Sequence, residues 1–135
     1  MAIRSAQSMV EAAMAEVETL PVTAAQALLG RDDVQFVDLR DVRELEREGV
    51  IPGAFHAPRG MLEFWVDPAC EYHQPVFSKP GVTFVLFCAA GWRSALATKT
   101  LQDMGLPAVA HIEGGFKAWK AAGAPVAEKV SRPKP

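Results

Sequence analysis

The chain has 135 residues, of which 50% are hydrophobic and 22% are charged. This length suits one domain, and this share of apolar residues can offset the conformational entropy lost on folding. The formal net charge is −2, and Lys and Arg are scattered along the chain, which argues against a nucleic-acid-binding protein. The longest apolar run, 82–90, falls short of the roughly 20 residues that cross a bilayer, so we predict no membrane span.

The chain start and the cysteines indicate the compartment. Polar residues interrupt the first ten positions and Glu11 follows, so a continuous apolar secretory signal is missing and we expect a cytoplasmic protein. Cys70 and Cys88 lack the spacing of a disulfide scaffold or a zinc site, and we expect two free thiols. The three histidines also lack a metal-ligand spacing, so we predict no metal and no cofactor.

The first elements are predicted from apolar periodicity and capping signals. Apolar residues at helical intervals predict an amphipathic helix over 5–19. Thr23–Gln26 has the form of a capping box and Gly30 is placed as a stop, which predicts a second, short helix. Val34–Leu39 is rich in apolar and β-branched residues and predicts a strand.

The middle of the chain predicts shorter elements. An acidic start signal at 41–44 predicts a helix after the strand. A short strand over 54–57 and a helix over 59–66 are expected next, ahead of an irregular connection over 67–81 that contains three prolines.

A continuous apolar run over 82–87 predicts a central strand that is covered on both faces. Cys88 follows this strand directly. Helical spacing then predicts a helix over 92–104, and a short strand over 109–112 and a short helix from Gly114 complete the pattern.

Strands that alternate with helices predict an α/β fold with a central, mostly parallel sheet flanked by helices. We divide the chain into an N-terminal helical extension over 1–20, a domain over 21–126 and a flexible tail over 127–135.

The loop after the central strand carries the chemistry. Sites in parallel sheets form at the carboxyl ends of strands, where Cys88 lies. Four residues separate Cys88 from Arg93. A loop this short can point its backbone N–H groups at the sulfur, while the helix dipole and Arg93 add positive potential, and these effects favour the thiolate. The same cradle would bind an anionic donor and hold the terminal sulfur of a persulfide.

We therefore predict Cys88 as the nucleophile, although a cysteine that ends an apolar strand can also be a packing residue. Gly91 would permit a left-handed backbone or a close approach to the ligand, and Ser94 would add a hydroxyl hydrogen bond. The predicted substrate-binding residues are Ala89, Ala90, Gly91, Trp92, Arg93, Ser94 and Arg59. Arg59 could face the mouth of the site or lie in solvent.

Asp38 and Arg40 end another predicted strand. Asp38 could accept hydrogen bonds from Arg40 or from the Cys88 loop, which would make the two residues a structural support of the site. A helix cap or turn cap is the alternative for Asp38. Cys70 could resolve an oxidised Cys88 or be a bystander.

Four segments resemble motifs of the rhodanese family: Phe36–Arg40, Gly49–His56, Cys88–Ser94 and Glu113–Trp119. The resemblance extends from about Pro21 to Val126. Val50 and His56 stand where the family commonly has His and Asn. The resemblance implies a rhodanese-like three-layer domain and a single-domain sulfurtransferase.

The resemblance also implies a reaction. Cys88 would attack a small sulfane-sulfur donor such as thiosulfate, become a persulfide, and pass the sulfur to a thiol or a cyanide-like acceptor. The loop is the shorter kind, because family phosphatases of the cell-cycle type have one more residue between Cys and Arg. A binding or regulatory module and a Cys-dependent phosphatase or arsenate reductase are the alternatives. The donor, the acceptor, the oligomeric state and the role of the N-terminal helix are left open.

Overall fold

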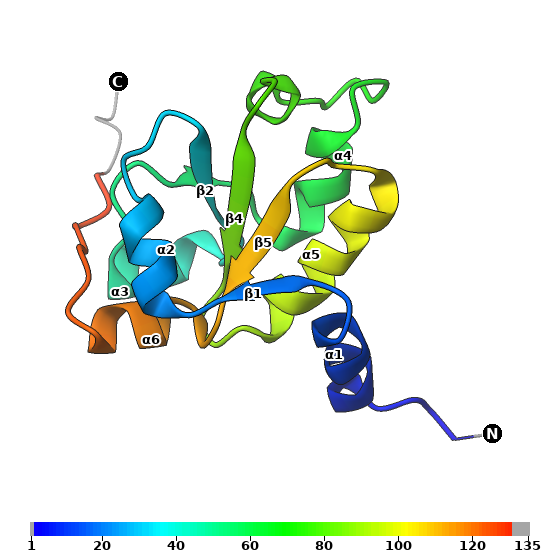
Figure 1. The fold of residues 1–135 in the computed structure, drawn as a ribbon, viewed down its shortest axis with the longest axis horizontal. Helices are drawn as coiled ribbons and strands as arrows, with labels where there is room; N and C mark the ends of the chain where they lie inside the picture. Colours follow the sequence, from blue (N-terminus) through cyan, green and yellow to red (C-terminus); the bar gives the residue numbers. More distant parts are fainter. Residues whose placement is uncertain (1, 131–135) are drawn as a thin grey trace.

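The computed structural model describes residues 2–130. Five parallel strands form one sheet in the order β1-β5-β4-β2-β3 (Figure 1). The strands are β1 (Glu18–Leu20), β2 (Val34–Asp38), β3 (Phe55–His56), β4 (Thr83–Phe87) and β5 (Val109–Ile112). The helices are α1 (Ala6–Met14), α2 (Val22–Leu28), α3 (Val42–Glu48), α4 (Leu62–Val66), α5 (Trp92–Met104) and α6 (Gly115–Ala121), with 3₁₀ turns at Arg59–Met61 and Pro75–Ser78.

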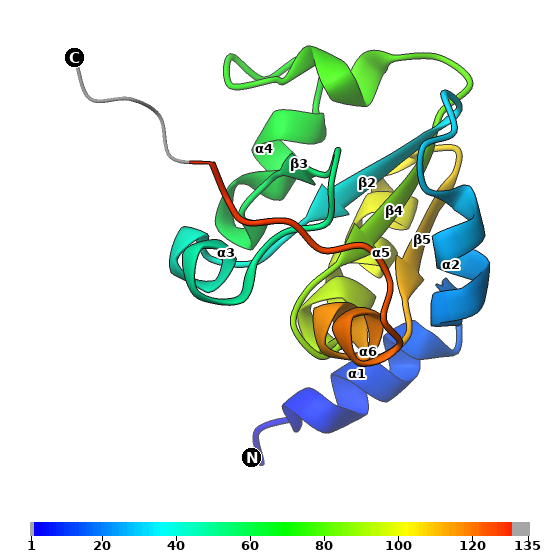
Figure 2. The same cartoon turned by 90° about the vertical axis from the view of Figure 1, so that its left-hand side faces the viewer.

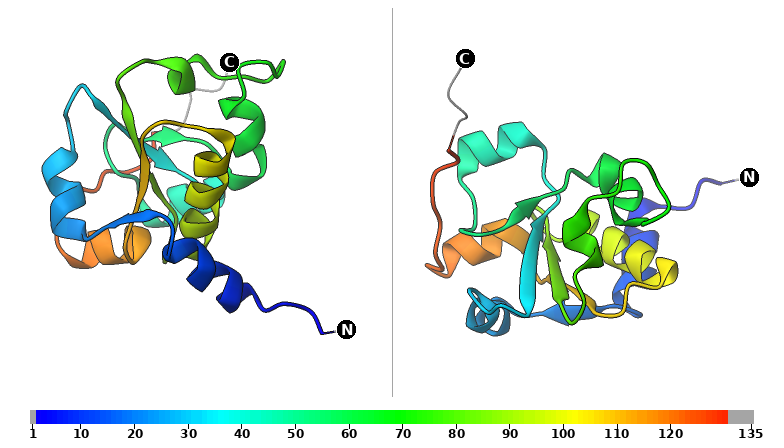
Figure 3. Two further views of the ribbon diagram at one scale, coloured as in Figure 1. Left: turned by 45° about the vertical axis from the view of Figure 1, so that its right-hand side comes forward. Right: turned by 90° about the horizontal axis from the view of Figure 1, so that it is seen from above.

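The sheet lies between two layers of helices, as the sequence predicts. Helices α4 and α5 cover one face, with α1 against α5, and α2 and α6 cover the other (Figures 2 and 3). Side chains of the central strand β4 alternate between the two faces. Phe84 and Leu86 pack in the core beneath α5, whereas Val85 and Phe87 pack with α2 and α6. The apolar run of β4 is thus buried on both faces.

The beginning of the chain differs from the prediction. The helix predicted over 5–19 ends at Met14, and Glu18–Leu20 forms the edge strand β1. Strand β1 exists because its backbone groups pair with β5, in the register Glu18 to Ala110. The predicted capping box at Thr23–Gln26 is also wrong, because α2 begins at Val22 with Pro21 as its N-cap and makes no side-chain capping hydrogen bond.

The two ends of the described chain both contact the rest of the molecule. Helix α1 packs against α5 through Val10, Ala13 and Ala95. Near the other end, Ala127 and Val50 exchange two backbone hydrogen bonds of 2.8 and 2.9 Å. The last part of the predicted tail, 131–135, lies outside the described residues. None of the helices within residues 2–130 is long and apolar enough to cross a membrane.

Candidate active site

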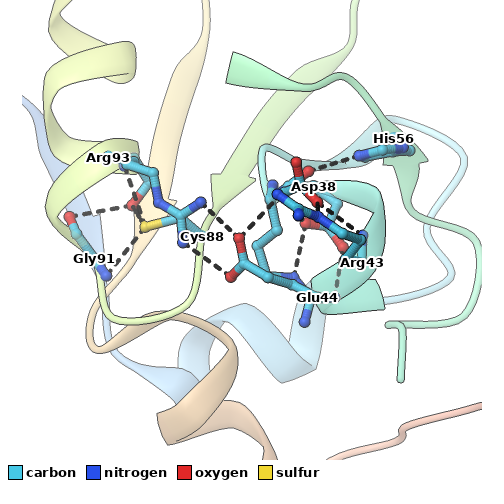
Figure 4. Close-up of polar contacts among 10 residues, drawn as sticks. Asp38, Arg43, Glu44, His56, Cys88, Gly91 and Arg93 are labelled. Atoms are coloured by element: carbon cyan, nitrogen blue, oxygen red, sulfur yellow. Dashed lines mark hydrogen bonds and ion pairs between the residues drawn. The ribbon is translucent and has the colours of Figure 1, made fainter. Parts of the chain in front are cut away.

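The site lies where two neighbouring strands end. Strands β2 and β4 are parallel, and Asp38 at the end of β2 pairs in register with Phe87 at the end of β4. Cys88 follows Phe87, and the chain then turns into α5. Carboxyl ends of parallel strands share one edge of the sheet, so the predicted nucleophile and the predicted Asp38–Arg40 support occupy one region (Figure 4).

The sulfur of Cys88 faces the N-terminus of α5. Backbone N–H groups of Gly91 and Ser94 donate to Sγ at 3.2 and 3.3 Å, and the Ser94 hydroxyl oxygen lies 3.6 Å from it. Gly91 has a φ of +105°, a left-handed conformation that L side chains rarely adopt. This bend places two N–H donors on the sulfur, which is the geometry expected of a cradle for negative charge.

Helix α6 holds the loop from the other side. The N–H of Phe116 donates to the carbonyl oxygen of Cys88 at 2.8 Å, and that of Lys117 donates to Ala89 at 3.0 Å. Gly115 permits this approach, because a Cβ there would lie 2.5 Å from the Cys88 carbonyl oxygen. Its φ of +61° also favours glycine. The closing Gly-Gly segment is therefore part of the support of the loop.

Arg93 forms a two-pronged ion pair with Glu44 of α3. Its two terminal nitrogens donate to the two carboxylate oxygens at 2.9 and 3.0 Å, as Figure 4 shows. The hydrogen bond from Arg93 holds the pKa of Glu44 below its ordinary value, and Glu44 in turn raises the pKa of Arg93. Glu44 is absent from the sequence-predicted site. Its placement in the capping box of α3, just after the end of β2, is the signal that points to this edge.

Asp38 and Arg40 form a buried ion pair beside the loop. The guanidinium donates to both Asp38 oxygens at 3.0 and 2.8 Å and to the Gly49 carbonyl at 2.8 Å. It also lies 4.0 Å from the ring centre of Phe116. Asp38 thus takes the first of the two partners that the sequence allowed, and Arg40 connects β2 with the helix that holds the Cys88 loop.

The other predicted substrate-binding residues occupy different places around the Cys88 loop. Ala89 lines a pocket of about 450 Å³ together with Glu44 and Phe116. Ala90 of the loop and Trp92, the first residue of α5, are exposed. Arg59 donates to Glu63 at 2.7 Å and lines a separate groove beside α1 and α5. Its predicted contact with substrate stays a prediction.

A buried histidine behind the sulfur has no counterpart in the sequence-predicted site. His111 of β5 is 1% exposed, and its Nδ1 lies 2.9 Å from the Ser94 hydroxyl. Burial lowers its pKa to about 4, so the ring is neutral near pH 7. Cys70 and Cys88 are both free, and no group of three His, Cys, Asp or Glu side chains that could hold a metal ion occurs within residues 2–130.

Comparisons with known proteins support the resemblance. A family model described as a rhodanese-like domain matches residues 21–122. A solved protein of Rhodopseudomonas palustris, described as of unknown function and a possible tyrosine phosphatase, is 52% identical, with a TM-score of 0.90, over 94% of this chain and 97% of that one. A polysulfide-sulfur transferase homodimer of Wolinella succinogenes is 31% identical, with a TM-score of 0.68, over 91% of this chain and 87% of that one.

Among curated relatives, an uncharacterized protein of Synechocystis sp. is 32% identical over 115 residues. The match covers 85% of this chain and 59% of that protein, so the chain spans less than two thirds of the relative's length. The family match covers the strands that end at the site, the Cys88 loop and α6. This chain belongs to the rhodanese-like domain family.

Proposed function

We propose that the protein is a sulfurtransferase in which Cys88 carries sulfane sulfur as a persulfide. The observation that carries this proposal is the pair of backbone N–H groups aimed at Sγ, in a loop with four residues between Cys88 and Arg93. Such donors stabilise a thiolate and would equally stabilise a negatively charged outer sulfur. The similarity to a protein described as a polysulfide-sulfur transferase supports the same chemistry.

The reaction has two balanced half-reactions. The Cys88 thiolate attacks the outer sulfur of a donor such as thiosulfate, the sulfur–sulfur bond of the donor breaks, and sulfite leaves with its electron pair. A nucleophilic acceptor then attacks the outer sulfur of the Cys88 persulfide, and the thiolate returns as leaving group. With cyanide as acceptor the product is thiocyanate. Neither half-reaction requires an external oxidant or reductant.

Each residue of the Cys88 loop and its supports would have a separate role in the reaction. The N–H groups of Gly91 and Ser94 would hold the charge on sulfur, and Arg93 would bind the anionic part of the donor. Glu44 occupies both arms of Arg93, so an anionic donor must compete with this carboxylate. Asp38 and Arg40 would keep the loop in place through α6.

A free thiol nucleophile suits a reducing compartment, and the cytoplasm is the proposed location.

The test is turnover with a panel of donors and cyanide as acceptor. Wild-type protein is expected to form thiocyanate with at least one sulfane donor, Cys88→Ser to form none, and Cys70→Ser to match wild type. Absence of thiocyanate with thiosulfate, polysulfide and thiol persulfides alike, in folded protein, would overturn the proposal.

A phosphatase is the second candidate, because the solved Rhodopseudomonas palustris relative is described as a possible tyrosine phosphatase. A cysteine and an arginine around an oxyanion site would serve that reaction as well. Turnover of an aryl phosphate that is lost in Cys88→Ser, without thiocyanate formation from any donor, would favour this candidate.

A further inference from the structure

Four polar side chains form a row from the edge of the sheet to the reactive sulfur. The Thr19 hydroxyl of β1 lies 3.0 Å from Nε2 of His111, and Nδ1 of His111 lies 2.9 Å from the Ser94 hydroxyl. The Ser94 hydroxyl oxygen lies 3.6 Å from the sulfur of Cys88. The row joins two strands, the first turn of α5 and the loop, and none of these residues is close in sequence except Cys88 and Ser94.

The centre of the row is buried. Cys88, Ser94 and His111 are each 1% exposed or less. The His111 ring forms hydrogen bonds with two hydroxyl groups and with no charged side chain within the described residues, and burial is the sole cause that lowers its pKa. The charged groups of the site, Arg93 with Glu44 and Asp38 with Arg40, pair with each other. The imidazole is therefore neutral and offers one donor and one acceptor nitrogen.

The count of hydrogens decides which nitrogen donates. Ser94 has one hydroxyl hydrogen, and in the neutral thiol state it is directed at the Gly91 carbonyl oxygen, 3.2 Å away. For that hydrogen to turn toward a negatively charged Sγ, the hydroxyl oxygen must accept from Nδ1–H of His111. Nε2 is then the free acceptor and takes the Thr19 hydroxyl hydrogen from its weaker alternative acceptor, the Met14 thioether sulfur 3.7 Å away. In the opposite tautomer Nδ1 would take the Ser94 hydrogen for itself, and the sulfur would lose this donor.

We propose that His111 is a positioning residue for sulfur transfer, which holds the Ser94 hydroxyl in the orientation that donates to Cys88 whenever its sulfur carries negative charge. Thr19 favours this tautomer from the far side of the ring when its hydroxyl donates to Nε2 in place of Met14 Sδ. This inference builds on the proposed function and adds a group outside the loop. It also gives the edge strand β1 a role in the site, through Thr19, in addition to its pairing with β5.

The test follows the ionisation of Cys88 and does not need turnover. The rate of alkylation by iodoacetamide is measured against pH in a Cys70→Ser background, for wild type, His111→Phe and His111→Asn. Loss of a hydrogen bond to a charged group predicts that His111→Phe raises the midpoint of the profile by about half to one pH unit and slows alkylation about three- to tenfold below it. His111→Asn keeps an N–H in the place of Nδ1 and is expected to restore most of the wild-type profile.

A matched control separates this effect from general loosening of the core. Thr98 is fully buried on α5, the helix that carries Ser94, and its hydroxyl donates to the Ser94 carbonyl at 2.7 Å. Thr98→Val therefore removes a buried hydrogen bond but leaves all four side chains of the row in place. Its alkylation profile should match wild type. A profile that shifts equally in Thr98→Val and His111→Phe, or an unshifted profile in His111→Phe, would overturn the proposal.

A second measurement stands even where His111→Phe folds poorly. Nitrogen-15 NMR of the His111 ring in the intact wild-type chain should show a protonated Nδ1 and an unprotonated Nε2, and Thr19→Val should reduce that preference. The reverse tautomer in wild type would overturn the proposal. Because alkylation and NMR do not depend on a sulfur donor, they can succeed or fail independently of the sulfurtransferase activity.

Discussion

The contact between α6 and the Cys88 loop can be tested with one added methyl group. Gly115→Ala places a Cβ at 2.5 Å from the Cys88 carbonyl oxygen and at 2.8 Å from the carbonyl carbon of Ala89. These distances are far below ordinary van der Waals contact, and both neighbours are backbone atoms, so the loop and the helix must separate. Gly123→Ala is the matched control, because Gly123 has a similar φ of +75° but nothing within 4 Å of the added Cβ.

The expected magnitudes follow from this pair. A left-handed conformation costs a non-glycine residue about 1–2 kcal/mol, and both variants incur this cost. Separation of α6 from the loop also weakens the two hydrogen bonds from Phe116 and Lys117, at about 1 kcal/mol each. Gly115→Ala should therefore lower the free energy of unfolding by about 3–4 kcal/mol, and Gly123→Ala by about 1–2 kcal/mol.

Urea unfolding measures the stability difference, and sulfur transfer to cyanide measures the state of the loop. Gly115→Ala should lose at least about tenfold in activity because the donors on Sγ move with the loop, whereas Gly123→Ala should keep wild-type activity at temperatures where it is folded. Equal stability losses in the two variants, or full activity in folded Gly115→Ala, would refute the reasoning that the first turn of α6 shapes the site.

Three further predictions concern charge. Arg40→Leu leaves the buried Asp38 carboxylate without its partner and should lower the free energy of unfolding, measured by urea denaturation, by about 3–5 kcal/mol. Replacement of both residues by leucine should recover part of that loss. Glu44→Gln keeps the helix cap but removes the charge that would compete with an anionic donor for Arg93, so the KM for thiosulfate should fall about three- to tenfold, while Glu46→Gln, at an exposed position of the same helix, should leave it unchanged. His111 has a folded pKa of about 4, below its ordinary value near 6.5. The unfolded chain therefore takes up a proton on this ring at a higher pH than the folded chain does. The contribution of the neutral ring to the free energy of unfolding is complete above pH 6.5 and is lost as the pH falls toward 4, on the order of 3 kcal/mol in all. His111→Asn should remove this part of the pH dependence, measured by unfolding at a series of acidic pH values.

Local sequence signals account for the central elements. The apolar run before Cys88 and the glycine at each end of the following helix mark β4 and α5 by composition and turn chemistry alone, and the predicted bounds of α5 are those of the structure. The resemblance of four segments to one family also led to the correct fold. Strand β1 was missed because three residues carry no period of their own, and its partner β5 lies about ninety residues further along the chain.

Two neighbours of the Cys88 loop, Glu44 and His111, were also not predicted, because they lie far from the loop in the sequence. Arg93 could be identified because its spacing from Cys88 is local, whereas the carboxylate that pairs with it comes from α3, 49 residues earlier. His111 sits in an apolar strand, where a lone histidine has no distinguishing pattern. Its relation to Ser94 appears when β5 lies beside the first turn of α5. Residues that act across elements need the fold before they can be recognised.

The central claim is that Cys88 carries sulfur, and mass spectrometry tests it most directly. Protein incubated with a sulfane donor, freed of excess donor and digested without reductant, should show the mass of one added sulfur on the Cys88 peptide. That mass should disappear on addition of cyanide with formation of an equal amount of thiocyanate. An unmodified Cys88 peptide with every donor, or added sulfur confined to the Cys70 peptide, would contradict the account.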